Sequence, residues 1–194
     1  MKLIFIRHGE TTGDVENRYG GNYNDHLTDR GREQATAARE ELKVKNIDLI
    51  ISSPFIRAQE SAEILADNKC PIIIEPDFRE RNQYGILTGR IKEEAAIERS
   101  DLTELLKDRL NTIEGAESYE DFKNRIQNAF NKLITKNQNG CVATIWHGGP
   151  MRVLFRNILK LGELDKLGDF AWVELEKTDD GFKIINSKRM EFLF

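Results

Sequence analysis

Residues 3–14, LIFIRHGETTGD, place four consecutive apolar residues directly before a group of polar and charged ones. A short apolar run of this kind is typical of a buried strand. Arg7 and His8 therefore stand at the carboxyl end of an expected strand, Leu3–Ile6, and Gly9 follows them. Ligands of open parallel sheets bind beyond the carboxyl ends of the strands. This stretch thus predicts both a central strand and part of a binding site.

Other short apolar runs predict further strands, with helical patterns between them. The expected strands are Ile47–Ile51, Ile72–Ile74 and Val142–Trp146. Two helices are expected to begin after an N-cap: one after Thr28, and one after Ser53 with Pro54 in the first helical position. Two more are expected from Ser118 and from Gly148 onward. This alternation predicts an α/β protein, a three-layer α/β/α arrangement with a mostly parallel central sheet, in one domain over 1–194.

The tail FAWVELEKTDDGFKIINS reads as a hairpin with Asp180-Gly181 at its turn. Its last residues, MEFLF, leave two readings open. They pair with a second copy in a homodimer, or they close the sheet within one chain.

Composition restricts the partners. The chain has 194 residues, 39% apolar and 32% charged, with a net charge of −4, which argues against a broad basic face for nucleic acid. A phosphate-sized ligand must then be held by locally placed arginines. Cys70 and Cys141 fit no ligand spacing and are expected to be reduced thiols, and the three histidines form no metal motif. With no signal peptide and no apolar span, we expect a cytoplasmic protein without a membrane partner.

Three expected strands deliver arginine or histidine to the same edge of the sheet. Arg7-His8 follows the first strand, Arg57 follows the second, and His147 with two glycines follows the fourth. Arginine matches the oxygens of phosphate, and glycines let the backbone approach a ligand closely. Alone, each is more often a structural residue than a catalytic one, but together they predict an anion pocket.

Five stretches carry a resemblance to a known family. They are RHGETT (7–12), the run from Arg18 through Gly21 to LTDRG and QA, SSPFIRAQESAEIL (52–65), GAES (115–118) with Asp121 and Arg125, and WHGGPMR (146–152). Together they resemble the histidine phosphatase superfamily, which includes the cofactor-dependent phosphoglycerate mutases and many small phosphatases. The resemblance covers nearly the whole chain. It implies the phosphoglycerate mutase-like fold, with a small cap-like insertion around 79–117.

The resemblance also implies roles. His8 would attack phosphorus and form a phosphohistidine, while Arg7, Arg57 and His147 surround the transferring group. Glu80 would protonate the leaving alcohol and later accept a proton from water. Further phosphate contacts are expected from Asn17 and Gly148, and substrate contacts from Gly21, Tyr84 and Lys92. No metal and no cofactor is implied, which fits the lack of a ligand cluster.

The chain departs from the family pattern at three places. Asp14 stands where the family commonly has asparagine, and a carboxylate there would repel phosphate, so Asn17 is the expected substitute. The Gly-x-x-Asp and Pro-Leu-Thr elements read GNYN (21–24) and HLT (26–28). One extra residue before Tyr84 moves the loop around Glu80, so Arg79, Arg81 and Asn82 are also candidates to face the substrate. Basic residues near the cap hint at a second acidic group on the substrate, namely Arg79, Arg81, Lys92 and Arg99.

These residues predict a phosphomonoester hydrolase acting on a small phosphorylated metabolite. Residues 93–112 form a charged segment without the longer insertion of the mutases, and a shorter, more open cap favours hydrolysis. The alternatives are a cofactor-dependent phosphoglycerate mutase and a non-catalytic module that only binds a phosphorylated ligand.

Overall fold

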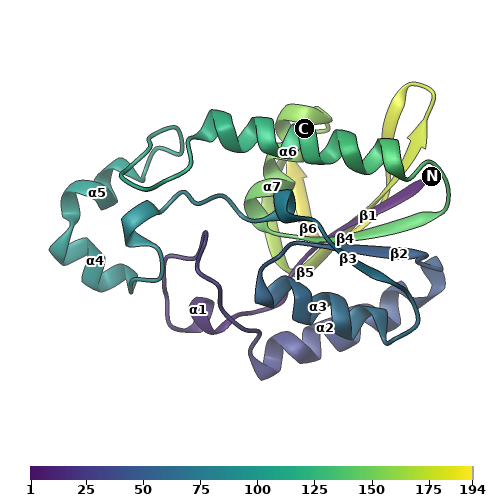
Figure 1. Cartoon of the computed structure of the whole chain (residues 1–194), viewed down its shortest axis with the longest axis horizontal. Helices are drawn as coiled ribbons and strands as arrows, with labels where there is room; N and C mark the ends of the chain where they lie inside the picture. The colour runs from purple at the N-terminus through teal and green to yellow at the C-terminus, as the bar shows by residue number, and fades with distance from the viewer. Residues whose placement is uncertain (194) are drawn as a thin grey trace.

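Six strands form one mixed sheet in the order β3-β2-β4-β1-β5-β6 (Figure 1). The computed structural model describes residues 1–193. Strands β1 (Lys2–Arg7), β2 (Leu49–Ser52), β3 (Ile72–Ile74) and β4 (Cys141–Trp146) are mutually parallel. Strands β5 (Glu163–Thr178) and β6 (Gly181–Leu193) are antiparallel. The predicted mostly parallel sheet is therefore confirmed.

β1 lies inside the sheet, between β4 and β5, and is apolar on both faces. Because side chains alternate along a strand, Leu3 and Phe5 enter one core cluster, whereas Ile4 and Ile6 enter the other. All four side chains are fully buried. A strand covered on both sides holds the residues at its carboxyl end, Arg7 and His8, in fixed positions.

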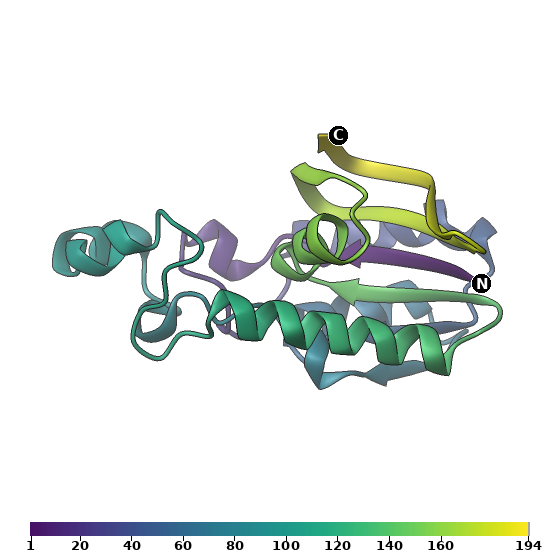
Figure 2. The same ribbon diagram turned by 90° about the horizontal axis from the view of Figure 1, so that it is seen from above.

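Two layers of helices supply that cover, as Figures 1 and 2 show. On one face lie α2 (Asp29–Leu42) and α3 (Ile56–Ala66). On the other lie α6 (Tyr119–Lys136), α7 (Gly148–Val153) and the π-helical turn η4 (Leu154–Ile158). The predicted N-cap Thr28 is confirmed, because its side chain accepts a hydrogen bond from the third helical N–H of α2; Ser118, where a helix was expected to start, caps α6 in the same way.

The predicted start of α3 is wrong. The helix begins at Ile56 with Phe55 as N-cap, so Ser53 and Pro54 lie in the turn before it. The physical reason is that the Ser53 hydroxyl lies 2.7 Å from Nε2 of His147, across the sheet edge. Ser53 thus serves the site rather than the helix.

Residues 79–117 extend beyond the end of the sheet (Figures 1 and 2). They include η3 (Gly85–Leu87), α4 (Lys92–Glu98) and α5 (Ser100–Leu105) around a small core of their own: Leu87, Ala95, Leu102 and Ile113. Shorter elements elsewhere are α1 (Thr12–Val15), η1 (Lys43–Lys45) and η2 (Pro76–Phe78). We call residues 79–117 the cap segment. That these residues form a cap-like insertion with these bounds remains a prediction.

The tail forms the predicted hairpin, with Thr178 opposite Gly181 across the turn. Its far end pairs within the chain, since Leu193 lies opposite Glu163. The tail therefore closes the sheet, and a homodimer stays a prediction. Within residues 1–193, no helix has the length and apolarity that a membrane crossing needs.

Candidate active site

A cavity of about 510 Å³ lies at the carboxyl ends of β1 and β4, facing the cap segment. Within the described part of the chain its lining includes eight basic and three acidic residues. The basic residues are Arg7, Arg18, Arg57, Arg81, Lys92, Arg109, Arg152 and Arg156, and the acidic ones are Asp14, Asp25 and Glu80. A chain of net negative charge thus concentrates positive charge in one cavity, which suits an anionic ligand.

His8 is held in one tautomer. Its Nδ1 lies 2.8 Å from the carbonyl oxygen of Gly9, which can only accept, so Nδ1 carries the proton. Nε2 is then the unprotonated nitrogen, and its lone pair accepts a hydrogen bond from Nε of Arg57 at 3.3 Å. Burial, and then the charges of Arg57 and Arg7, lower the pKa of His8 well below its usual value of 6.5. The ring is therefore neutral and presents a nucleophilic nitrogen.

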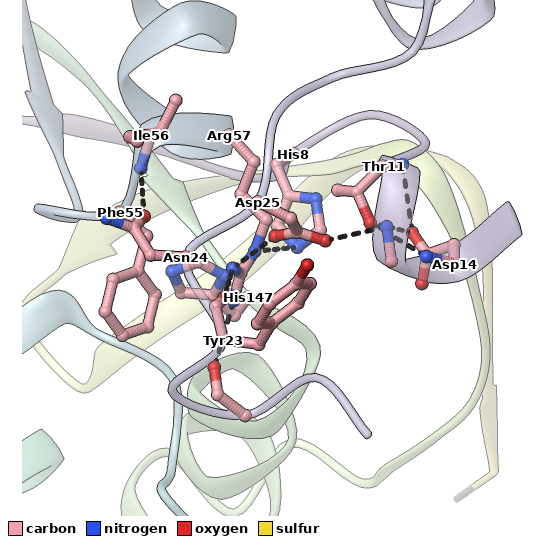
Figure 3. Close-up of polar contacts among 12 residues, drawn as sticks. His8, Thr11, Asp14, Tyr23, Asn24, Asp25, Phe55, Ile56, Arg57 and His147 are labelled. Atoms are coloured by element: carbon pink, nitrogen blue, oxygen red, sulfur yellow. Dashed lines mark hydrogen bonds and ion pairs between the residues drawn. The ribbon is translucent and has the colours of Figure 1, made fainter. Parts of the chain in front are cut away.

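Arg57 is anchored by a buried ion pair that the sequence did not indicate. Its Nη1 lies 2.8 Å from Oδ1 of Asp25 and donates to the carbonyl oxygen of Tyr23 at 2.6 Å, while its Nη2 donates to that of Gly21 at 3.2 Å. Both charged side chains are about 5% exposed. Figure 3 shows Asp25 and Arg57 beside His8. This pairing fixes the guanidinium against the nucleophile.

Arg7 also lines the cavity and is held from the β5 side. Its Nη1 donates to the carbonyl oxygen of Leu167 at 3.0 Å and pairs with Asp169 at 3.0 Å. Two guanidinium groups from different elements therefore flank His8, as the sequence predicted.

His147 packs against His8 with ring centroids 5.0 Å apart, and it is fully buried. It lies behind the cavity wall rather than in the lining. Ser53 contacts its Nε2, and Nδ1 has no hydrogen-bond partner within residues 1–193. Burial, with Arg57 next in effect, lowers the pKa of His147 well below 6.5, so this ring is neutral too.

Glu80 enters the cavity from the loop after β3. Its carboxylate accepts from the backbone N–H of Gly149 at 2.9 Å and of Arg81 at 2.7 Å. A Cβ at residue 149 would stand 2.2 Å from the carboxylate, so only glycine permits this approach. Burial raises the pKa of Glu80, although both hydrogen bonds oppose the shift. A carboxyl group that keeps its proton more readily suits a general acid.

The other predicted residues divide into two groups. Gly21, Tyr84, Lys92 and Gly148 all line the cavity. Asn17 does not: it is exposed, and its side-chain amide donates to Glu93 in α4. Its predicted phosphate contact therefore has no support in the geometry. Of the alternatives near Glu80, Arg81 lines the cavity, whereas Arg79 and Asn82 bind neighbouring backbone or carboxylate groups outside it.

Asp14 has a local structural explanation. It is the third residue of α1, and its Oδ2 accepts hydrogen bonds from the N–H and from the hydroxyl of Thr11 (Figure 3). In return, the hydroxyl oxygen of Thr11 accepts a hydrogen bond from the N–H of Asp14. This is a capping box, which stabilises a helix N-terminus. Because Asp14 also lines the cavity, a phosphate that binds there would meet a negative charge.

Replacing Asp14 with asparagine is expected to tighten competitive inhibition by inorganic phosphate about fivefold. One unfavourable charge interaction of roughly 1 kcal/mol is removed, while the amide oxygen can still cap α1. The measurement is the phosphate inhibition constant, with Asp29→Asn as a control that makes the same charge change outside the cavity. An unchanged constant would show that the Asp14 carboxylate does not face the bound phosphate.

The two buried neutral histidines predict a loss of stability in acid. Their folded pKa values lie below 6.5, so the unfolded chain binds more protons as pH falls through 6.5. Each then removes about 1.4 kcal/mol from the free energy of unfolding per pH unit, until its folded pKa is reached. The raised pKa of Glu80 acts in the opposite direction.

Urea unfolding at pH 7.5 and 5.5 measures this loss of stability. The variant His147→Gln removes the contribution of His147 and keeps those of His8 and Glu80. The variant should lose clearly less stability between the two pH values than the unchanged chain. Equal losses would mean that His147 is protonated in the folded protein.

Sequence reasoning missed several site residues. Asp25 could not be found because it lies in a loop and anchors Arg57 of α3, which is 32 residues further along the chain. Arg152 and Arg156 did carry a signal, since they lie four residues apart on the helix that follows the His147 motif. Within residues 1–193, no group of three or more histidine, cysteine, aspartate or glutamate side chains could hold a metal ion.

The chain was compared with known proteins. It is 30% identical over 172 residues to a metal-independent phosphoserine phosphatase of Arabidopsis thaliana, covering 86% of this chain and 72% of the relative. It is 29% identical over 160 residues to phosphoglycerate mutase-like protein 4 of the same plant, covering 79% and 69%. The crystal structure of an alpha-ribazole phosphatase from Shigella flexneri superposes with a TM-score of 0.85 at 23% identity, covering 97% and 96%.

The family model of the histidine phosphatase superfamily (branch 1) matches residues 3–187. This range contains the strand that carries His8, the loop of Glu80 and the motif of His147. The chain belongs to the histidine phosphatase superfamily.

Proposed function

We propose that this protein hydrolyses phosphate monoesters of small metabolites through a phosphohistidine at His8. The observation that carries the proposal is the state of His8: a neutral ring whose protonated Nδ1 is bound to a carbonyl and whose Nε2 faces Arg57. Binding alone would not need a buried nucleophile in the same cavity as a carboxyl group of raised pKa.

In the first step, the lone pair of His8 Nε2 attacks phosphorus, and the bond to the ester oxygen breaks. Glu80 gives its proton to that oxygen, so the alcohol leaves neutral and the phosphoryl group stays on His8. Arg7 and Arg57 balance the charge on the phosphoryl oxygens. His147 lies behind them, with its ring 5.0 Å from that of His8, and supports the position of the nucleophile. Positioning and charge stabilisation carry most of the barrier reduction in such transfers.

In the second step, water attacks the phosphohistidine and gives a proton to the Glu80 carboxylate. The N–P bond breaks, inorganic phosphate forms, and His8 regains its lone pair. Glu80 ends the cycle protonated, as it began. The same two side chains therefore serve both steps, and we expect neither a metal ion nor an organic cofactor to be required.

The substrate class follows from the cavity and from the relatives. A cavity of about 510 Å³ with eight basic residues suits a small phosphorylated metabolite. The relatives' names point to phosphoserine, phosphoglycerate and alpha-ribazole phosphate. We expect the protein to act in the cytoplasm, without nucleic acid or membrane partners.

A mutase is the second candidate, because a relative is named phosphoglycerate mutase-like. A mutase must keep water away from its phosphohistidine and return the phosphoryl group to the substrate. The short helices of the cap segment, six and seven residues long, enclose the cavity less fully than a long insertion would. We therefore favour hydrolysis.

The test uses purified protein and a panel of monoesters: O-phosphoserine, 3-phosphoglycerate with a bisphosphoglycerate primer, alpha-ribazole 5′-phosphate and 4-nitrophenyl phosphate. His8→Ala sets the background. Inorganic phosphate released in a His8-dependent manner is the expected result. Conversion of 3-phosphoglycerate to its isomer without release would establish the mutase. Phosphate binding with no turnover on any ester would establish a binding module.

A further inference from the structure

A second group of basic side chains lies in the same cavity, gathered around Tyr119 at the start of α6. The guanidinium carbons of Arg81 and Arg109 lie 5.4 and 5.9 Å from the centre of its ring. Arg156, from η4, donates to the Tyr119 hydroxyl at 3.2 Å. We call Arg81, Arg109, Arg156 and Tyr119 the Tyr119 cluster. Every member lines the cavity that contains His8.

The positive charge of this cluster is only partly balanced. Arg156 pairs with Glu163, but Arg81 and Arg109 make no ion pair with any residue within 1–193, and neither does the neighbouring Arg152. Arg109 and Arg152 also lie near enough to Glu163 to lower its pKa. Together with Arg156, three guanidinium groups therefore share the negative charge of one carboxylate. Like charges held this close disfavour one another unless an anion joins them.

Arg81 lies within the electrostatic reach of Glu117 and Glu80, but it makes no ion pair with either and keeps one donor without a partner within residues 1–193. It is 3% exposed, and its Nε and Nη1 donate to the carbonyl oxygens of Glu117 and Arg109 at 3.1 and 2.6 Å. Its Nη2 is buried without any acceptor in the described part of the chain. Buried charges in proteins are nearly always paired, and a guanidinium with a free donor matches an anionic oxygen. The remaining partner is therefore expected to come from the ligand.

The cluster lies on the side of the cavity where the leaving alcohol must be. Arg81 directly follows Glu80, and its N–H binds the Glu80 carboxylate that is proposed to protonate the ester oxygen. Arg152 lies near the same place, since its Nη1 would stand 3.1 Å from a Cβ on Gly148, the residue before the Gly149 N–H that binds Glu80. The part of the substrate beyond the ester oxygen thus extends from Glu80 toward Tyr119.

We propose that the Tyr119 cluster, together with Arg152, binds a second anionic group on the alcohol part of the substrate, either a carboxylate or a second phosphate. This inference rests on the proposed phosphatase function. Such a site would favour phosphorylated hydroxy acids, phosphorylated amino acids and bisphosphates over phosphate esters of neutral or cationic alcohols. The cluster then determines which substrate is chosen, whereas His8 and Glu80 determine the reaction.

Matched substrate pairs test the proposal. O-Phosphoserine and O-phosphoethanolamine differ only in the carboxylate, and fructose 1,6-bisphosphate and fructose 6-phosphate differ only in the second phosphate. At least one pair should show kcat/KM about 100-fold higher for the more anionic member. Arg109→Gln and Arg152→Gln should each reduce that ratio about tenfold, since a hydrogen bond to a charged group is lost. Which pair responds identifies the anion.

Arg99→Gln is the control, because Arg99 lies in the cap segment, pairs with Asp101 and does not line the cavity. It should leave the ratio unchanged. A ratio near one for both pairs, or a ratio that neither cavity variant alters, would overturn the proposal. Failure of the phosphatase function is a separate result: no His8-dependent release from 4-nitrophenyl phosphate. The same pairs are then titrated into His8→Ala protein by calorimetry, which measures the preference without turnover.

Discussion

Replacing His8 with alanine is expected to lower the rate of phosphate release by about 10⁴-fold or more, because it removes the atom that forms the covalent intermediate. The two arginines and His147 would remain, so the variant should still bind inorganic phosphate. Rapid quenching of the unchanged protein with a labelled ester should trap an acid-labile, alkali-stable phosphoenzyme, and the variant should give none.

His26→Ala is the matched control. His26 is 62% exposed, lies 2.9 Å from Glu60 and does not line the cavity, so its loss should leave the rate nearly unchanged. If His8→Ala kept a tenth of the activity, or if the label appeared on the variant, His8 could not be the nucleophile.

Replacing Glu80 with glutamine is expected to lower kcat/KM for alkyl phosphates about 10²–10⁴-fold, the usual contribution of a positioned proton donor. The Gly149 and Arg81 N–H groups donate to different oxygens of Glu80, so glutamine keeps only one of these two hydrogen bonds and part of the loss will come from the loop. With 4-nitrophenyl phosphate, whose leaving group needs no proton, the loss should be at least about tenfold smaller.

The pH profile separates a proton donor from a structural role. In the unchanged protein, kcat/KM for alkyl phosphates should fall as pH rises through the raised pKa of Glu80, because the acid loses its proton. Glu80→Gln should remove this decline. Glu93→Gln, a charge change in α4 outside the cavity, should keep it. An equal loss for both classes of leaving group would indicate that Glu80 acts only through the loop.

The fold could be predicted because its strands carry a strong and local signal. The run Leu3–Ile6 is apolar at every position since both sheet faces are covered, and Thr28 and Ser118 are N-caps whose effect depends on their own next three residues. The start of α3 could not be predicted, because Ser53 is drawn into a contact with His147, 94 residues away. Local rules fail where a distant partner competes for the same hydroxyl.

The site shows the same division. His8 and Arg57 were predicted from their motifs and Glu80 from the family resemblance, and the structure brings all three to one cavity. The role expected of Gly9 was to admit phosphate, but a Cβ there would stand 2.8 Å from the carbonyl oxygen of Gly31 and from the Phe170 ring, which is sufficient reason for a glycine. The Tyr119 cluster combines three separate parts of the chain, so no short motif could reveal it.

The backbone of His8 is fastened on both sides: its N–H donates to the Trp146 carbonyl at 3.2 Å, and its carbonyl accepts from Phe170 at 3.3 Å. The cap segment, by contrast, depends on four buried apolar side chains. The nucleophile therefore belongs to the most cooperative unit of the molecule, whereas one wall of the cavity belongs to a unit that opens at lower cost. As temperature rises, the contributions of Glu80, Arg81 and Arg109, which belong to the cap segment, should be lost before that of His8.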